Sequence, residues 1–162
     1  MAKVILALGS NLGDPHRQMK EAATFLTEIT PQSPVLSSIY RTEPVGPSEN
    51  DFLNAVAMIE TAMEPHELLT RIKEQERKQG RPSRYPKWTA RTLDIDIIAY
   101  DDLVIEADNL IIPHPEYTDR LFVLMPLKEV RPDWSDPATG RHVDTMIEEA
   151  PGIRIQKTNL TW

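Results

Sequence analysis

The chain has 162 residues, of which 40% are hydrophobic and 27% are charged. These proportions are typical of a globular protein and exclude extended disorder, so we expect a single domain over residues 1–162. A formal net charge of -7 disfavours general binding to nucleic acids, because phosphate backbones attract basic surfaces. The absence of cysteine excludes disulfides, thiolate catalysis and cysteine-bound zinc, and it fits a reducing compartment.

The apolar run near the N-terminus, residues 4–8, is too short for a signal-peptide core or a membrane span. We therefore expect a cytoplasmic protein with no membrane partner. We also expect a monomer that acts on small molecules and does not bind nucleic acid.

Apolar periodicity and turn residues predict six elements in the first 100 residues. The predicted strands are 3–8, 35–42, 52–60 and 93–100, and the predicted helices are 15–29 and 65–79. Asp14 can cap the first helix, Pro15 and Pro65 suit first helical turns, and Gly80 follows the second helix. The proline-rich and glycine-rich segments 43–50 and 80–90 are predicted loops.

The resulting order, β-α-β-β-α-β, is the ferredoxin-like pattern of the α+β class. In this pattern an antiparallel sheet carries both helices on one face and leaves the other face free for a ligand. The last third of the chain is then a C-terminal extension. Residues 101–105 predict a hairpin onto the sheet, and residues 117–123 and 144–149 predict short helices.

Two carboxylates lie one residue apart in the last predicted strand. Asp94 and Asp96 should share one face, while Leu93, Ile95 and Ile97 point into a core. The Cα atoms of the two acids would be about 6.6 Å apart, close enough for like-charge repulsion unless a cation compensates. Mg²⁺ is the favoured cation, since it binds one or two carboxylates together with water and substrate phosphates. An alternating strand with a solvated acidic face would show the same pattern.

The loop before this strand is basic in a chain that is acidic overall. Residues 81–91 contain no acid and four cations: Arg81, Arg84, Lys87 and Arg91. Cations beside paired acids suggest a polyphosphate held by metal on one side and by guanidinium groups on the other. A solvated charged turn is the plain alternative. Tyr85 and Trp88 also allow an RNA-stacking loop, but a lid over a nucleotide fits better.

Three further features carry weaker signals. The glycine-rich segment 9–14 lacks the ending of a phosphate-binding Walker A loop, so a tight turn before a capped helix is favoured. Asn54 lies in an apolar strand, where a buried amide needs hydrogen-bond partners. His114 is fixed between two prolines, at a point where the chain can return to the face that carries Asp94 and Asp96.

The ordered set of motifs resembles the 6-hydroxymethyl-7,8-dihydropterin pyrophosphokinase family. The resemblance covers about residues 4–128, and a single Asp-x-Asp would not justify it. Its motifs are ALGSNLG (7–13), YRTEPVGP (40–47), FLNA (52–55), Gly80-Arg81, Trp88, RTLDIDI (91–97), PHP (113–115), Arg120 and Phe122.

The resemblance implies transfer of pyrophosphate from ATP to the pterin hydroxymethyl oxygen, with release of AMP and with two Mg²⁺ ions. It implies that Asp94 and Asp96 bind the metal and that Arg81 and Arg91 approach the transferring group. The implied pterin contacts are Thr42, Pro44, Val45, Phe52, Asn54, Trp88 and Phe122, with the two phenylalanines sandwiching the ring. The implied ATP contacts are Lys73, Glu76, Arg84, Trp88, Arg91, Ile97, His114 and Arg120.

Two other classes of function remain open at this stage. Other ferredoxin-like sheets also hold metals on paired acids, so a nucleotidyl transferase or cyclase is one alternative. A non-catalytic nucleotide-binding or RNA-binding module is the second. Thr89-Ala90 also departs from the Gly-Pro usual in the family, which affects the expected closing geometry of the lid.

Overall fold

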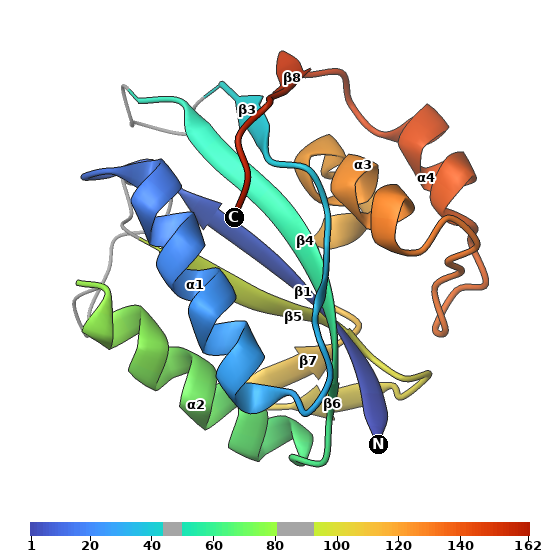
Figure 1. Ribbon diagram of the computed structural model, residues 1–162. Helices are drawn as coiled ribbons and strands as arrows, with labels where there is room; N and C mark the ends of the chain where they lie inside the picture. The colour runs from blue at the N-terminus through green and yellow to red at the C-terminus, as the bar shows by residue number, and fades with distance from the viewer. Residues whose placement is uncertain (44–49, 81–92) are drawn as a thin grey trace.

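The computed structural model describes residues 1–43, 50–80 and 93–162, and its centre is an antiparallel sheet. The strands lie in the order β5-β1-β4-β3-β8, with β2 also pairing with β4 (Figure 1). Their bounds are β1 Ala2–Ser10, β2 Val35–Leu36, β3 Tyr40–Thr42, β4 Phe52–Thr61, β5 Asp94–Tyr100 and β8 Ile155–Lys157. The order of the first four neighbours confirms the predicted ferredoxin-like arrangement.

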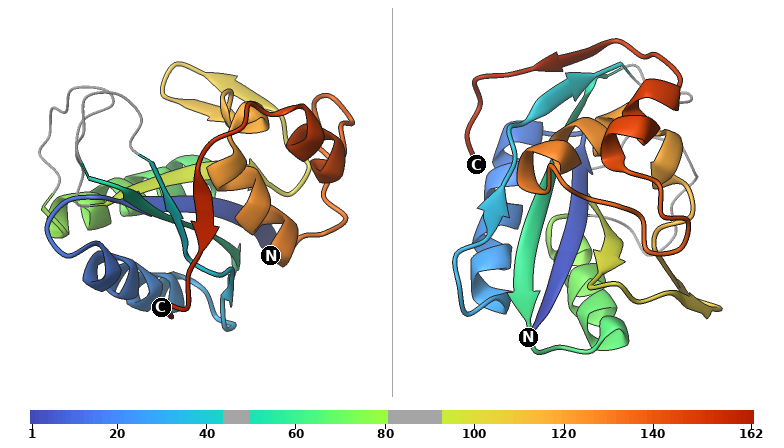
Figure 2. Two further views of the ribbon diagram at one scale, coloured as in Figure 1. Left: turned by 90° about the horizontal axis from the view of Figure 1, so that it is seen from above. Right: turned by 90° about the vertical axis from the view of Figure 1, so that its right-hand side faces the viewer.

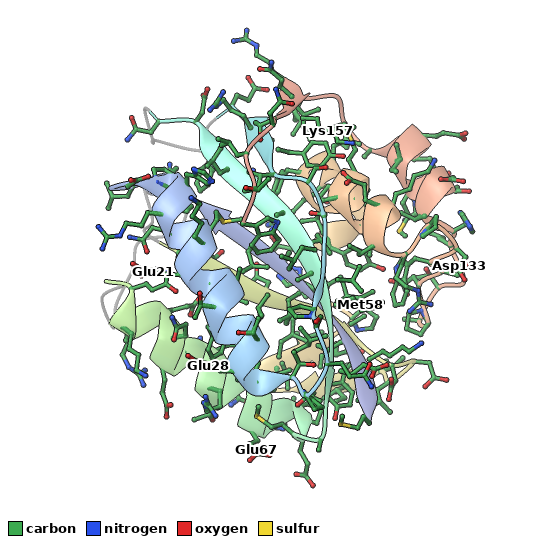
Figure 3. The ribbon with its side chains drawn as sticks, viewed as in Figure 1. Glu21, Glu28, Met58, Glu67, Asp133 and Lys157 are labelled. Carbon is green, nitrogen blue, oxygen red and sulfur yellow. The ribbon has the colours of Figure 1, made fainter. Side chains whose placement is uncertain are left out.

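Helices α1 (Pro15–Ile29) and α2 (Pro65–Lys78) cover one face of the sheet (Figure 1). The N-terminus of α1 is fixed as expected, since the Asp14 side chain accepts a hydrogen bond from the Arg17 amide. Met19, Leu26 and Ile72 are buried against apolar strand residues of this face. Charged residues such as Glu21, Glu28 and Glu67 lie on the outer sides of these helices (Figure 3). This amphipathic packing forms the first core.

The opposite face of the sheet is partly covered, which corrects the expectation that it is free. Helices α3 (Leu121–Val130) and α4 (Val143–Glu149) lie on that side (Figure 2). A second core joins them to the sheet, made by Ile5, Ala7, Val56, Ile98, Ala99, Tyr117, Val123, Leu124, Leu127, Val130, Trp134, Val143 and Met146. A ligand face is therefore restricted to the part of the sheet that α3 does not cover.

Hydrogen bonds fix α3 to the sheet at β3. The Glu129 carboxylate accepts bonds from the Ser38 amide at 3.0 Å, the Ser38 hydroxyl at 2.9 Å and the Tyr40 hydroxyl. Burial raises the pKa of Glu129, but the bonds from Tyr40 and Ser38 outweigh it and lower that pKa overall. The ionised carboxylate thus joins the helix to the strand.

A buried polar network lies beneath α4. Tyr117, in the 3-10 turn Tyr117–Asp119, donates its hydroxyl proton to the buried Asp136 and accepts a bond from the Trp134 indole. Burial, followed by the bond to Asp136, raises the pKa of Tyr117 above its usual 10.0. This network fixes the segment between His114 and α3.

Two strand predictions need correction. The expected strand 35–42 is split into β2 and β3. Leu36 pairs with Ala57 and Tyr40 pairs with Asn54, so this segment advances by four residues where β4 advances by three. One extra residue of this kind disrupts the ladder in the manner of a bulge. Strand β8 was not predicted, and it adds a further strand beside β3.

The hairpin predicted at 101–105 onto the sheet also needs correction. The hairpin consists of β6 (Ile105–Ala107) and β7 (Leu110–Ile112), and it forms a separate two-stranded sheet. The helix predicted at 117–123 is a 3-10 turn followed by α3, and the one at 144–149 is α4. Of the predicted loops 43–50 and 80–90, residues 44–49 and 81–90, including Thr89-Ala90, lie outside the described residues. Among the described helices, none has the length and apolar character needed to cross a membrane.

Candidate active site

Asp94 and Asp96 lie on the sheet face opposite α1 and α2. Both side chains are half-buried on β5, while Leu93, Ile95 and Ile97 are buried in the first core. The alternation predicted from the sequence is therefore confirmed. Among the described residues, no group of three or more histidine, cysteine, aspartate or glutamate side chains gathers as a metal cluster.

Glu76 supports the strand between the two acids. This buried residue of α2 accepts a hydrogen bond from the Ile95 amide at 2.9 Å. In the described sheet β5 is the end strand, and an end strand presents backbone groups that need partners. Glu76 supplies one, so it fixes the backbone from which Asp94 and Asp96 project.

A row of opposite residues links Asp94 to Asn54 across the sheet. Asp94 pairs with Gly9 on β1, and Gly9 pairs with Asn54 on β4. Directly opposite residues share a face, so Asp94 and Asn54 flank Gly9 on the same side, with their Cα atoms about 10 Å apart. A Cβ atom added at Gly9 would meet the Asn54 Oδ1 at 3.1 Å. Gly9 therefore leaves the space that Asn54 occupies.

The buried Asn54 amide was expected to need a hydrogen-bond partner, and the structure shows that Thr42 is one. Asn54 is 6% exposed, and its Nδ2 donates a hydrogen bond to the Thr42 hydroxyl oxygen at 2.8 Å. This bond fixes the amide orientation, with the Oδ1 on the side of Gly9. Asn54 can thus present an acceptor beside the acidic pair.

Phe52 and Phe122 reach the same side of the sheet from different elements. Phe52 is half-buried and shares a face with Asn54, two residues along β4. Phe122 is the second residue of α3 and packs against the second core, and the Arg120 guanidinium lies 5.7 Å from the centre of its ring. Two aromatic side chains and an amide are therefore available on this face for a flat ligand.

His114 lies beside the acidic pair, as expected. Its amide donates to the Ile98 carbonyl at 2.9 Å, and its Nε2 is 3.9 Å from the Asp96 Oδ2. The Nδ1 accepts a bond from the Glu116 amide, so the neutral ring carries its proton on Nε2. Burial, followed by the Arg120 charge, lowers the His114 pKa below 6.5, against the opposing charges of Glu116 and Asp94.

Several expected site residues lie elsewhere or outside the described part of the chain. Ile97 points into the first core, so any nucleotide contact that it makes is through its main chain. Lys73 is exposed on α2, and Arg120 forms an ion pair with Glu116 beside His114. Outside the described residues are Pro44, Val45, Arg81, Arg84, Trp88 and Arg91.

The donor set of the acidic pair fits Mg²⁺. Carboxylate oxygens are the hard ligands that this ion prefers, and the half-exposed pair leaves room for water and phosphate oxygens. Fold and site together define a ferredoxin-like domain suited to a metal-bound polyphosphate substrate.

Comparison with known proteins identifies the family within this class. The family model described as 7,8-dihydro-6-hydroxymethylpterin-pyrophosphokinase (HPPK) matches residues 5–132. The chain belongs to this family.

Curated relatives carry the corresponding name, 2-amino-4-hydroxy-6-hydroxymethyldihydropteridine pyrophosphokinase. The protein from Synechocystis is 35% identical over 161 residues, covering 93% of this chain and 82% of the relative. The one from Bacillus subtilis is 37% identical over 154 residues, covering 94% and 89%. The one from Haemophilus influenzae is 39% identical over 135 residues, covering 82% and 84%.

Solved structures support the fold. A Plasmodium falciparum HPPK-DHPS structure with pteroate matches with a TM-score of 0.71 and 16% identity over 91% of this chain. An HPPK-DHPS complex with substrates matches with a TM-score of 0.68 and 14% identity over 91% of this chain. This chain spans 42% and 43% of those two chains, which are therefore considerably longer.

Gly9 is a site residue that the sequence analysis missed. It was interpreted as part of a turn, whereas it lies inside β1, between Asp94 and Asn54. A glycine inside a strand often marks a close approach by another group, but the predicted strand ended at residue 8, so this signal could be read only after the structure extended β1 to Ser10.

We expect Gly9→Ala to displace the Asn54 side chain while the sheet remains folded. The added Cβ would lie 3.1 Å from the Asn54 Oδ1, tighter than ordinary contact. The NMR signals of the Asn54 side-chain amide should shift, and Gly152→Ala should leave them unchanged because no atom lies within 4 Å of its added Cβ. Unchanged Asn54 signals in Gly9→Ala would contradict this geometry.

Proposed function

We propose that the chain transfers pyrophosphate from ATP to the hydroxymethyl group of 6-hydroxymethyl-7,8-dihydropterin, a step of folate biosynthesis. The observation that carries the proposal is the single sheet face that holds Asp94 and Asp96, with Asp94 across Gly9 from Asn54. Family membership and the names of the relatives support the same activity.

The reaction is an in-line displacement at the β-phosphorus. The pterin hydroxyl oxygen forms a bond to that phosphorus, the bond to the oxygen bridging the α- and β-phosphates breaks, and AMP leaves. The hydroxyl proton is released. A neutral alcohol must meet a highly charged triphosphate, so catalysis rests on positioning and on neutralisation of charge.

Asp94 and Asp96 are the proposed ligands of two Mg²⁺ ions. When bound, the metal neutralises phosphate charge and orients the triphosphate. The hydrogen bond from the Ile95 amide to the Glu76 carboxylate fixes the strand between the two acids, whose alternation places both carboxylates on one face. Arg81 and Arg91 are proposed to approach the transferring group, as guanidinium groups bind phosphate oxygens in pairs.

The nucleotide is proposed to lie along the β5 end of the sheet. His114 would donate its Nε2 proton to a phosphate oxygen, since its Nδ1 is already occupied by the Glu116 amide. Arg120 would add a positive charge. The remaining proposed contacts are Lys73, Glu76, Arg84, Trp88, Arg91 and the main chain of Ile97. Because Glu76 bonds to Ile95, it contributes at least as a support of the metal ligands.

The pterin is proposed to lie over Gly9, beside Asn54. The Asn54 Oδ1 would accept a hydrogen bond from the polar edge of the ring, while Thr42 fixes the amide. Phe52 and Phe122 would stack on the ring faces. Pro44, Val45 and Trp88 are the other proposed pterin contacts.

We further propose that the protein works in the cytoplasm as a monomer and without a nucleic-acid partner. The acidic net charge and the lack of cysteine support this setting.

The products of the reaction test the proposed function. Purified protein given ATP, Mg²⁺ and hydroxymethyldihydropterin should release AMP and form the pterin pyrophosphate, with both substrates required. Chromatography of the nucleotides would measure this directly. Release of ADP or of free pyrophosphate instead would contradict the reaction, and would favour an ordinary kinase or a nucleotidyl transferase.

We expect Asp94→Asn and Asp96→Asn each to reduce kcat by at least about 100-fold, since each removes a charged metal ligand. Both variants should keep the wild-type circular dichroism, because the two side chains are half-exposed. Asp102→Asn is a matched control on an exposed turn and should retain full activity. Wild-type turnover in either ligand variant would exclude the proposed metal site.

A further inference from the structure

Residues 154–162 form a strap along the β3 side of the sheet, and we refer to them as the C-terminal strap. Strand β8 pairs with β3, and the Thr158 amide then donates to the Ile39 carbonyl at 3.0 Å. Further along, the Trp162 indole donates to the Ser37 carbonyl at 2.8 Å. The strap thus follows residues 37–43 for their whole length (Figure 2).

The strap is also attached to the body of the protein. Leu160 and Trp162 pack against the first core, and the His16 Nε2 lies 2.7 Å from the Thr161 carbonyl oxygen. At the other end, the Arg154 amide donates to the Glu43 carboxylate at 3.1 Å. These contacts extend well beyond the three pairs of β8 itself. The strap lies outside residues 5–132, which the family model matches.

Strand β3 depends on the strap for its outer neighbour. It has only three residues, and it lies between β4 and β8 in the described sheet. A strand this short, with one side unpaired, would have more backbone freedom. Thr42, whose hydroxyl fixes the Asn54 amide, lies directly opposite Ile155.

We infer that the C-terminal strap is a positioning element for pterin binding, which orders β3 so that Thr42 holds Asn54 toward the ligand. The inference rests on the proposed function, which assigns Asn54 to the pterin. The strap should affect pterin binding but not nucleotide binding, because β8 and β5 lie at opposite ends of the described sheet. Its loss should weaken pterin binding and leave the nucleotide site at Asp94 and Asp96 intact.

Proline substitutions at two neighbouring residues distinguish the loss of strand pairing from a general effect of proline on the strap. Backbone hydrogen bonds join Thr158 to Ile39 and Glu43 to Arg154, and in an antiparallel ladder hydrogen-bonded pairs alternate with pairs that are not hydrogen-bonded. The Gln156 amide therefore faces Arg41 on β3, whereas the Lys157 amide faces outward. Gln156→Pro removes a ladder bond, and Lys157→Pro removes none. Gln156→Ala controls for loss of the exposed side chain.

The experiment is calorimetric titration of the full-length protein with hydroxymethyldihydropterin, in the presence of Mg²⁺ and a saturating non-hydrolysable ATP analogue. Gln156→Pro should raise the pterin Kd by about tenfold, corresponding to about 1.4 kcal/mol. Its Kd for the ATP analogue alone should stay within about twofold of wild type. In Lys157→Pro and Gln156→Ala, the Kd for pterin and the Kd for the ATP analogue should both stay within about twofold of wild type. In steady-state assays, KM for pterin should rise more than kcat falls.

A folded Gln156→Pro variant with the wild-type pterin Kd would overturn the inference. So would equal weakening of both substrates, because that indicates a general structural defect. If Gln156→Pro does not fold, Thr158→Val decides the matter in the same way. That change removes the Thr158 hydroxyl, which donates to the Ile39 carbonyl and accepts a bond from the Leu160 amide, and it keeps the backbone pairing, so a smaller rise of about threefold is expected. Failure of wild-type protein to bind pterin would instead contradict the proposed function.

Discussion

The site depends on two like charges held side by side on β5. Asp94 and Asp96 are half-exposed on one face, where their like charges repel each other, so their own interaction does not hold them together. They are kept there because Leu93, Ile95 and Ile97 are buried on the other face, and because Glu76 binds the intervening amide. A pair fixed in this way is ready to bind a cation that relieves the repulsion, which is the property that a polyphosphate-transferring enzyme requires.

The two cores have different roles in building this face. The first core, beneath α1 and α2, supports the alternating strands. The second core packs α3 over only part of the opposite face, and Glu129 joins that helix to Ser38 and Tyr40. Asp94, Gly9 and Asn54 form a row across the sheet beyond this second core. The chain can therefore keep a stable interior and still present charged and aromatic groups to ligands.

Much of this arrangement was predictable from local sequence signals. The strict alternation at 93–97, the capping residue Asp14 and the proline at the start of α2 each act within a few residues, and the structure has the elements that they predicted. The need of Asn54 for a partner was also predictable, and Thr42 meets it. Long-range packing was not. The split of the strand 35–42 depends on its register against β4, and β8 depends on a neighbour more than 100 residues away. The role of Gly9 likewise becomes visible only when β1 lies between β4 and β5.

The central claim is that the Asp94 and Asp96 carboxylates hold the divalent metal that orients the triphosphate. The most direct measurement is anomalous diffraction from crystals grown with Mn²⁺ in place of Mg²⁺, a non-hydrolysable ATP analogue and hydroxymethyldihydropterin. We predict anomalous peaks about 2.1 Å from oxygens of both carboxylates and of the triphosphate, with the pterin ring over Gly9. Anomalous peaks bound only elsewhere, with both carboxylates turned away from the nucleotide, would contradict the account.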